Sequence, residues 1–217
     1  MKQIITKSLQ DMLSKDVILF VLKMGLISLA VTSLLTWNLW DTFNNLIASY
    51  LSWIPWEWLQ TSGASVATFS LAYMLFIIIV SLLTSLYSEK LLIALAKKRY
   101  PDVPVVGSAN ITTSILLTLK ASIIFLLLFM ITLPLLFIPM FGQVLVLYLW
   151  SILLKEPTIY DVGALFIDDK KVLKEKKKKT RVLAMVAALF NYVPLVNIFA
   201  PVFAQILFLH HILGEEK

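Results

Sequence analysis

The pattern of apolar and polar positions divides the chain into four long apolar runs separated by polar segments. The first two runs, residues 17–40 and 63–87, are each long enough to cross a hydrocarbon core of about 30 Å as a helix, at about 1.5 Å per residue. Between them, residues 41–62 hold several Trp, whose apolar ring and polar N–H suit the headgroup boundary. The pattern predicts two spanning helices joined by a loop at the membrane surface.

The carboxyl-terminal half carries two apolar runs, residues 111–154 and 182–213, that are broken by proline and glycine. The breakers are Pro134, Pro139, Gly142, Pro194 and Pro201. The pieces of the second run are shorter than the roughly 20 residues that a spanning helix needs. Irregular backbone at membrane depth has to be buried in protein or line a wet cavity. We therefore expect two hemi-penetrating helical hairpins, with turns at the far membrane face as the open alternative.

Basic segments set the expected orientation of the chain. Residues 1–16 interleave Lys with apolar residues at helical spacing, which predicts an amphipathic helix on the cytoplasmic membrane surface. Residues 88–110 carry a basic cluster, and residues 155–181, ending in KVLKEKKKKTR, are expected to form a basic cytoplasmic loop. Residues 41–62 contain no Lys or Arg. Because Lys and Arg are retained on the cytoplasmic side, we expect both termini there, in a multi-pass membrane protein.

Composition supports this pattern and excludes other classes of protein. Hydrophobic residues make up 59% of the 217 and charged residues 15%, whereas a soluble domain has about 45–50% and about 25%. A soluble or disordered chain is therefore excluded, and we expect a single membrane domain over residues 1–217. The chain has no Cys. Its net charge is +6, and nearly all of its basic residues lie outside the apolar runs, which favours anionic lipid over nucleic acid as the partner.

Motifs for catalysis are missing from the sequence. It contains no Gly-rich phosphate loop, HExxH motif or nucleophile elbow, so we expect neither an enzyme nor a cofactor. The two histidines, His210 and His211, are adjacent and point about 100° apart on a helix, which makes a poor metal pair. We interpret them as partly solvated side chains near the carboxyl-terminal interface.

Two lysines, Lys23 and Lys120, are the only Lys, Arg, Asp or Glu residues within the apolar runs. A charge at membrane depth is costly, and it is by default a candidate for function. Each also lies close enough to a cytoplasmic helix end for its ammonium to reach the headgroups. Both interpretations stay open: a lysine that snorkels to the surface, or one that faces a substrate pathway.

Two side-chain amides, Gln143 and Asn197, lie beside the breakers of the two hairpins. They could satisfy backbone groups that the prolines release, or line a hydrated path for a polar solute. The break before Asn197 also leaves a helix amino terminus, whose free N–H groups favour an anion, although Pro201 removes one donor. We therefore count both amides with the two lysines as substrate-pathway candidates.

Two short motifs carry a resemblance to a known family. The segment VPLVNIFAPVFAQILFLHH (193–211) resembles the most characteristic stretch of the CysZ-type sulfate permease family, which also includes the eukaryotic etoposide-induced membrane proteins. FIPMFGQ (137–143) is similar to a turn of the same family. The matching residues are Pro194, Leu195, Val196, Asn197, Ala200, Pro201 and Val202 in the first motif and Ile138, Pro139, Gly142 and Gln143 in the second.

The resemblance implies a protein of the bacterial inner (cytoplasmic) membrane that oligomerises and takes up sulfate without sodium. One motif departs from the family pattern. Bacterial sulfate permeases of the family have Pro-Gly-(Leu/Ile)-Arg just before the first long helix, with the Arg serving sulfate. This chain has Lys15, Asp16, Val17 and Ile18 there, and Lys does not reproduce the bidentate fork of Arg.

Together these observations predict an all-α integral membrane protein that serves as a permease or channel for an oxyanion, sulfate by resemblance, and that assembles as a homo-oligomer. The alternative is a non-transporting membrane protein, such as an assembly or lipid-interacting factor, with the same fold. The missing Arg motif is the sequence feature that favours the alternative.

Overall fold

A computed structural model describes residues 2–53, 55–132, 135, 138–176, 180–193 and 195–214, and all of its regular elements are helical. The α-helices are α1 (Lys2–Met12), α2 (Lys15–Tyr50), α3 (Glu57–Tyr87), α4 (Glu89–Arg99), α5 (Ile111–Thr132), α6 (Phe141–Phe166), α7 (Lys170–Lys176), α8 (Thr180–Ala188) and α9 (Ala200–Leu213). Two 3-10 turns, η3 (Leu189–Tyr192) and η4 (Val196–Phe199), lie between α8 and α9. Four helical segments are long and apolar enough to cross a membrane: α2, α3, α5 and residues Val196–Leu213. The predicted all-α membrane fold is thereby confirmed.

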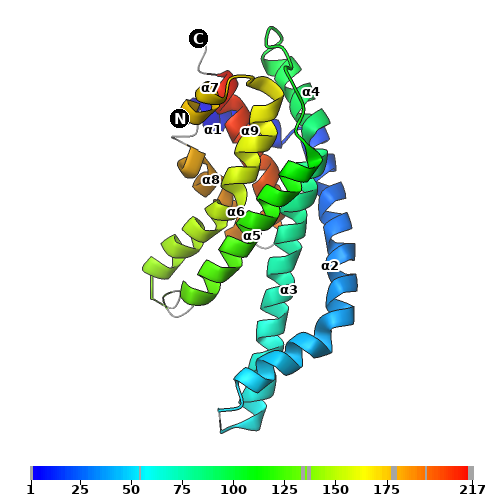
Figure 1. The fold of residues 1–217 in the computed structure, drawn as a ribbon, viewed down its shortest axis with the longest axis vertical. Helices are drawn as coiled ribbons and strands as arrows, with labels where there is room; N and C mark the ends of the chain where they lie inside the picture. Colours follow the sequence, from blue (N-terminus) through cyan, green and yellow to red (C-terminus); the bar gives the residue numbers. More distant parts are fainter. Residues whose placement is uncertain are drawn as a thin grey trace.

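Helices α2 and α3 form a hairpin that is longer than the sequence pattern predicted. They have 36 and 31 residues, or roughly 54 and 47 Å at about 1.5 Å per residue. The expected loop at residues 41–62 is mostly helical, because neither glycine nor proline interrupts residues 41–50 and apolar side chains continue at helical spacing. Figure 1 shows this hairpin extending well beyond the turn between α5 and α6.

Helix α6 also runs further than expected, through the first part of the segment predicted as a basic cytoplasmic loop. Residues 155–166 complete this 26-residue helix, and its last two turns are largely buried. Pro157 lies inside the helix. Apolar residues that recur around it, among them Ile159, Val162 and Leu165, pack into the core and outweigh the hydrogen bond that proline removes. The strongly basic part of the segment begins only at α7.

The two breaks share an unusual backbone conformation. Met140 (φ 62°) and Leu195 (φ 70°) are the positive-φ residues of the described chain, and each precedes the next helical segment. Of the predicted breakers, Pro139 lies in the α5–α6 turn, and Gly142 is buried in the first turn of α6. Pro201 lies in the first turn of α9, where a missing N–H costs little. Pro134 and Pro194 lie outside the described residues.

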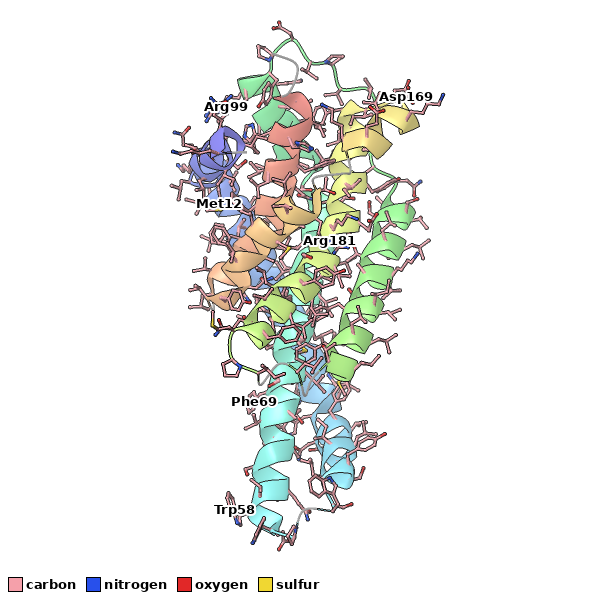
Figure 2. The ribbon with its side chains drawn as sticks, turned by 90° about the vertical axis from the view of Figure 1, so that its left-hand side faces the viewer. Met12, Trp58, Phe69, Arg99, Asp169 and Arg181 are labelled. Carbon is pink, nitrogen blue, oxygen red and sulfur yellow. The ribbon has the colours of Figure 1, made fainter. Side chains whose placement is uncertain are left out.

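Helix α9 is the centre of the core. All 14 of its residues are buried, and it packs against α1, α6 and α8 (Figure 1). Most of its side chains, including Phe203, Phe208 and Leu209, are hydrophobic, as expected of a helix with no exposed face. Figure 2 places Arg99 and Asp169 at one end of the molecule and Trp58 at the other.

Candidate functional site

Three of the four predicted pathway residues lie on the surface of the protomer. The side chains of Lys23 on α2 and Lys120 on α5 are exposed, and so is that of Gln143 on α6. The backbone carbonyl of Gln143 accepts a hydrogen bond from the Tyr192 hydroxyl, which ties α6 to the break before α9. The structure does not bring these residues together within one protomer.

Asn197, the fourth predicted pathway residue, is buried, with 1% of its surface exposed. Its side-chain Nδ2 donates to the Tyr73 hydroxyl of α3 at 2.8 Å. Its Oδ1 has no hydrogen-bond partner among the described residues. The amide therefore anchors the break to a spanning helix and retains one unused acceptor.

Asp161 on α6 is the centre of a polar cluster that sequence reasoning did not identify as a site. Ser85 on α3 donates to its Oδ2 at 2.5 Å, and Ser114 on α5 donates to its Oδ1 at 2.8 Å. Gln205 on α9 donates its Nε2 to Oδ2 at 3.3 Å. One carboxylate, 3% exposed, thus joins four helices whose residues are up to 120 positions apart in the sequence (205 minus 85).

Burial raises the pKa of Asp161 from its ordinary 3.8 to about 6, and the bonds from Ser85, Ser114 and Gln205 oppose that shift. Asp161 lies in the last part of α6, a helix that is not among the candidate membrane spans. Desolvation dominates because the carboxylate gives up more hydration than three hydrogen bonds replace. The group therefore changes its protonation state close to physiological pH.

A cavity of about 270 Å³ adjoins this cluster between α3, α4, α5 and α6. Its polar lining residues are Ser85, Ser88, Glu89, Ser108, Ser114 and Asp161. No Lys or Arg is among the described residues that line it. Ser108 is exposed and Glu89 is partly exposed, so the cavity communicates with solvent at the α4–α5 connection.

A second buried cluster is built on Asp11 of α1. Arg99 at the end of α4 donates from Nε and Nη2 to the Asp11 carboxylate at 2.9 and 2.5 Å. His210 on α9 places Nε2 at 3.0 Å from Asp11 Oδ2 and Nδ1 at 2.8 Å from the Tyr100 hydroxyl. Asp11 is 2% exposed, so the carboxylate is stable only because it is paired on two sides.

The interpretation of both histidines as partly solvated was wrong. His210 and His211 are 1% and 4% exposed, because α9 has no solvent face. His211 Nε2 lies 3.2 Å from the Lys176 carbonyl oxygen.

In the Asp11 cluster, the hydrogen bond to Asp11 raises the pKa of Arg99, and burial raises the pKa of Tyr100. The cluster fastens α1 to the bundle by charge as well as by packing.

A third polar group places two cations on the same face of α6. The Arg181 guanidinium of α8 donates to Ser151 Oγ at 3.2 Å and lies 5.0 Å from the centre of the Tyr148 ring. Lys155, one turn after Ser151, pairs with Glu156 at 3.0 Å. No described carboxylate bonds Arg181, which is partly buried. Its partners are neutral, so the guanidinium keeps most of its donors for another ligand.

The sequence contained a usable signal for one of these clusters only. Asp161 follows Tyr160 in an otherwise apolar stretch, and an isolated carboxylate in such a stretch has to find donors. Asp11 and Arg181 looked like ordinary members of polar segments. In the described part of the chain, no group of three or more His, Asp or Glu could hold a metal ion directly.

Comparisons with known proteins give a family but no individual relative. No curated protein and no solved structure matches the chain. The family model described as "Sulfate transporter CysZ/Etoposide-induced protein 2.4" matches residues 4–201 of the 217. This match covers both buried clusters except His210 and Gln205 and includes both breaks before α6 and α9. The chain belongs to the sulfate transporter CysZ/etoposide-induced protein 2.4 family.

Proposed function

We propose that the protein is an inner-membrane permease or channel for an oxyanion, with sulfate as the first candidate. The family supports transport, and the observation that carries the choice of an anion is Arg181. This guanidinium is partly buried, is held in place by Ser151 and Tyr148, and has no described carboxylate partner. An arginine presented in this way offers the planar fork that binds tetrahedral oxyanions.

Arg181 offers a substitute for the arginine that is missing before the first long helix. At that position Lys15 and Asp16 are exposed, and Val17 is fully buried, so no guanidinium is available there. Lys155 lies one turn from Ser151 on the same helix face and adds a second positive charge near Arg181. Glu156 neutralises part of that charge. The proposal therefore assigns the leading role to Arg181.

Lys23 and Lys120 fit the proposal only if protomers associate. Both side chains are exposed on the surface of the protomer. A solute could meet them along the boundary between copies of the chain in a homo-oligomer, and otherwise they extend to the lipid headgroups. The chain has no nucleotide-binding motif, so accumulation would have to use an existing gradient or a partner.

Sulfate uptake into liposomes containing the purified full-length protein tests the proposal. We expect Arg181→Gln to lower the initial rate about tenfold, since a charge-assisted hydrogen bond contributes about 1.5–3 kcal/mol. Arg181→Lys should have an uptake rate between those of the wild type and Arg181→Gln. Lys98→Ala, which removes an exposed cation of α4, should match the wild type. Lys23→Ala, Lys120→Ala and Asn197→Ala separate a pathway role from a structural one.

Two results would contradict the proposal. If wild-type vesicles take up neither sulfate nor a related oxyanion faster than empty vesicles, the protein is a non-transporting member of the family. If uptake occurs but Arg181→Gln and Lys98→Ala behave alike, transport stands and the role of Arg181 does not.

A further inference from the structure

The cavity beside Asp161 differs in chemistry from the Arg181 region. Its lining carries two carboxylates, those of Asp161 and Glu89, and no cationic side chain among the described residues. No salt bridge joins Glu89 to a described cation. The amino-terminal ends of α4 and α5, each equivalent to about half a positive charge, lie at the same wall and offset only part of this negative charge. The cavity therefore repels oxyanions.

The hydroxyl groups of the wall strengthen its negative character. Ser85 and Ser114 donate their protons to Asp161, so toward the cavity their oxygens can only accept hydrogen bonds or coordinate a cation. Each is an oxygen ligand of the kind that hard cations prefer. Asp161 thus orients two hydroxyl groups in addition to contributing its own charge.

Ser88 supplies an independent observation that points to a ligand. It lines the same cavity and is 1% exposed, yet its Oγ has no hydrogen-bond partner in the described part of the chain. A buried hydroxyl without a partner costs about 1–3 kcal/mol. Ser88 is the N-cap residue of α4, but its hydroxyl makes no cap hydrogen bond and does not bond Asp161, so it stays available to a ligand in the cavity.

We propose that this cavity binds a hydrated divalent cation of the Mg²⁺ class, held by Asp161, Glu89 and the surrounding serine hydroxyls. The size of the cavity indicates that the ion keeps water. About 270 Å³ is room for several water molecules at about 30 Å³ each, far more than a bare ion fills. Mg²⁺ commonly binds through one or two carboxylates while it retains much of its shell, which suits a wall with two carboxylates rather than a full set of ligands.

The site is independent of the proposed transport function. It lies between α3, α4, α5 and α6, whereas Arg181 lies on α8. A cation here would link the start of α4 to α6 through Glu89 and Asp161. It would thereby stabilise the ends of the spanning helices without contact with a transported anion.

Manganese binding to the full-length protein in nanodiscs of phosphatidylcholine alone tests the site, because this lipid is neutral and competes little for the ion. The loss of the electron paramagnetic resonance signal of free Mn²⁺ measures binding, and Mg²⁺ should displace it. We expect Glu89→Gln to weaken binding about tenfold and Ser88→Ala about threefold, corresponding to about 1.4 and 0.7 kcal/mol. These two variants spare Asp161, which also joins four helices.

Matched controls keep the test specific. Asp102→Asn removes an exposed carboxylate from the neighbouring α4–α5 connection. Ser8→Ala removes a buried hydroxyl of α1 that has no hydrogen-bond partner among the described residues. Neither residue lines the cavity, and both variants should bind Mn²⁺ as the wild type does. The proposal is overturned if no saturable, Mg²⁺-sensitive binding is found, or if Asp102→Asn weakens it as much as Glu89→Gln.

Discussion

Asp11 and Asp161 each hold together helices that are far apart in the sequence. Asp11 binds Arg99 and His210, and Asp161 accepts hydrogen bonds from Ser85, Ser114 and Gln205. In both clusters a buried carboxylate is satisfied by partners from at least two other helices. Removal of such a group leaves its partners buried without a counter-charge or an acceptor, which costs more than the bond itself contributes.

At Asp11 we expect the variant Asp11→Asn to lower the free energy of unfolding by about 2 kcal/mol, since Arg99 is partly exposed and keeps some hydration. The loss should be concentrated at α1, whose backbone amides should exchange hydrogen faster than in the wild type. Hydrogen exchange measured by mass spectrometry checks this. Asp16→Asn, an exposed carboxylate in the first turn of α2, should leave the exchange of α1 unchanged.

The raised pKa of Asp161 predicts a pH-dependent stability. Its pKa is about 6 in the folded protein and 3.8 ordinarily, so the folded state binds the proton more tightly. The stabilisation from this group is fully present below about pH 4 and is lost as the pH rises through 6. It amounts to at most about 3 kcal/mol, because the folded and ordinary pKa values differ by about two units. Thermal unfolding between pH 4.5 and 7.5 should show the decline, and Asp161→Asn should flatten it. An equal slope in both proteins would contradict the assignment.

At the scale of single residues, the sequence predicts how deep in the membrane a side chain lies. It does not predict whether that side chain faces the lipid or the protein core. Lys23 and Lys120 were recognised because a charge in an apolar run is conspicuous, yet helical periodicity is weak where lipid and core are equally apolar. Whether such a residue faces outward depends on which neighbours pack on the helix. The same limit explains His210, whose burial results from the central position of α9 rather than from its local sequence.

Helix ends were the least predictable feature at the scale of elements. The existence and type of the long helices follow from apolar length alone, and the breaks follow from Pro and Gly. The extension of α2 to Tyr50 and of α6 to Phe166 depends on contacts that the sequence does not display. At α6 the decisive contacts are those of Ile159, Val162 and Leu165 with the core, which overcome Pro157.

The turn before α6 contains a strained backbone conformation, and this strain can be tested. Met140 has φ 62° and ψ −48°, and Phe141 N bonds the Pro139 carbonyl across it at 2.7 Å, the geometry of a strained three-residue turn. The Met140 side chain is 80% exposed, so little packing is lost in Met140→Gly. We expect a net stabilisation of about 1 kcal/mol, since relief of about 1–3 kcal/mol of strain exceeds the entropic cost of glycine. Thermal unfolding in detergent measures it.

Ile138→Gly is the matched control for this turn. Ile138 lies two residues earlier and does not have a positive φ, so glycine there brings the entropic cost and the loss of a half-exposed side chain, with no strain to relieve. That variant should be less stable than the wild type. Equal shifts in the two variants would show that Met140 is not strained.

The lengths of the two hairpins determine how the whole molecule meets a bilayer. The α2–α3 hairpin, roughly 54 and 47 Å long, exceeds a hydrocarbon core of about 30 Å, whereas α5 at 22 residues is about 33 Å long. Figure 1 shows the α5–α6 turn set back from the α2–α3 turn. Exposed Trp37, Trp53, Trp56 and Trp58 lie on the longer hairpin, where they would mark its passage through a headgroup layer.

Cysteine labelling in this Cys-free chain tests the arrangement. A membrane-impermeant thiol reagent should label Trp58→Cys from the periplasmic side and Lys97→Cys from the cytoplasmic side. Met140→Cys, at the exposed α5–α6 turn, should resist the reagent from both sides if that turn ends within the membrane. Periplasmic labelling at 140 would show that the hairpin crosses completely. Cytoplasmic labelling at 58 would reverse the expected orientation.

The link from Asp11 to His210 spans 199 positions, and this bears on the order of biogenesis. Arg99 emerges from the ribosome long before His210, so the nascent α1 can acquire its first partner early but its second only after α9 has been synthesised. Helix α1 should therefore rest on the membrane surface, incompletely docked, until α9 inserts between it and α6 and completes the bundle. A chain truncated before residue 200 should leave α1 sensitive to protease, and a chain that includes α9 should protect it.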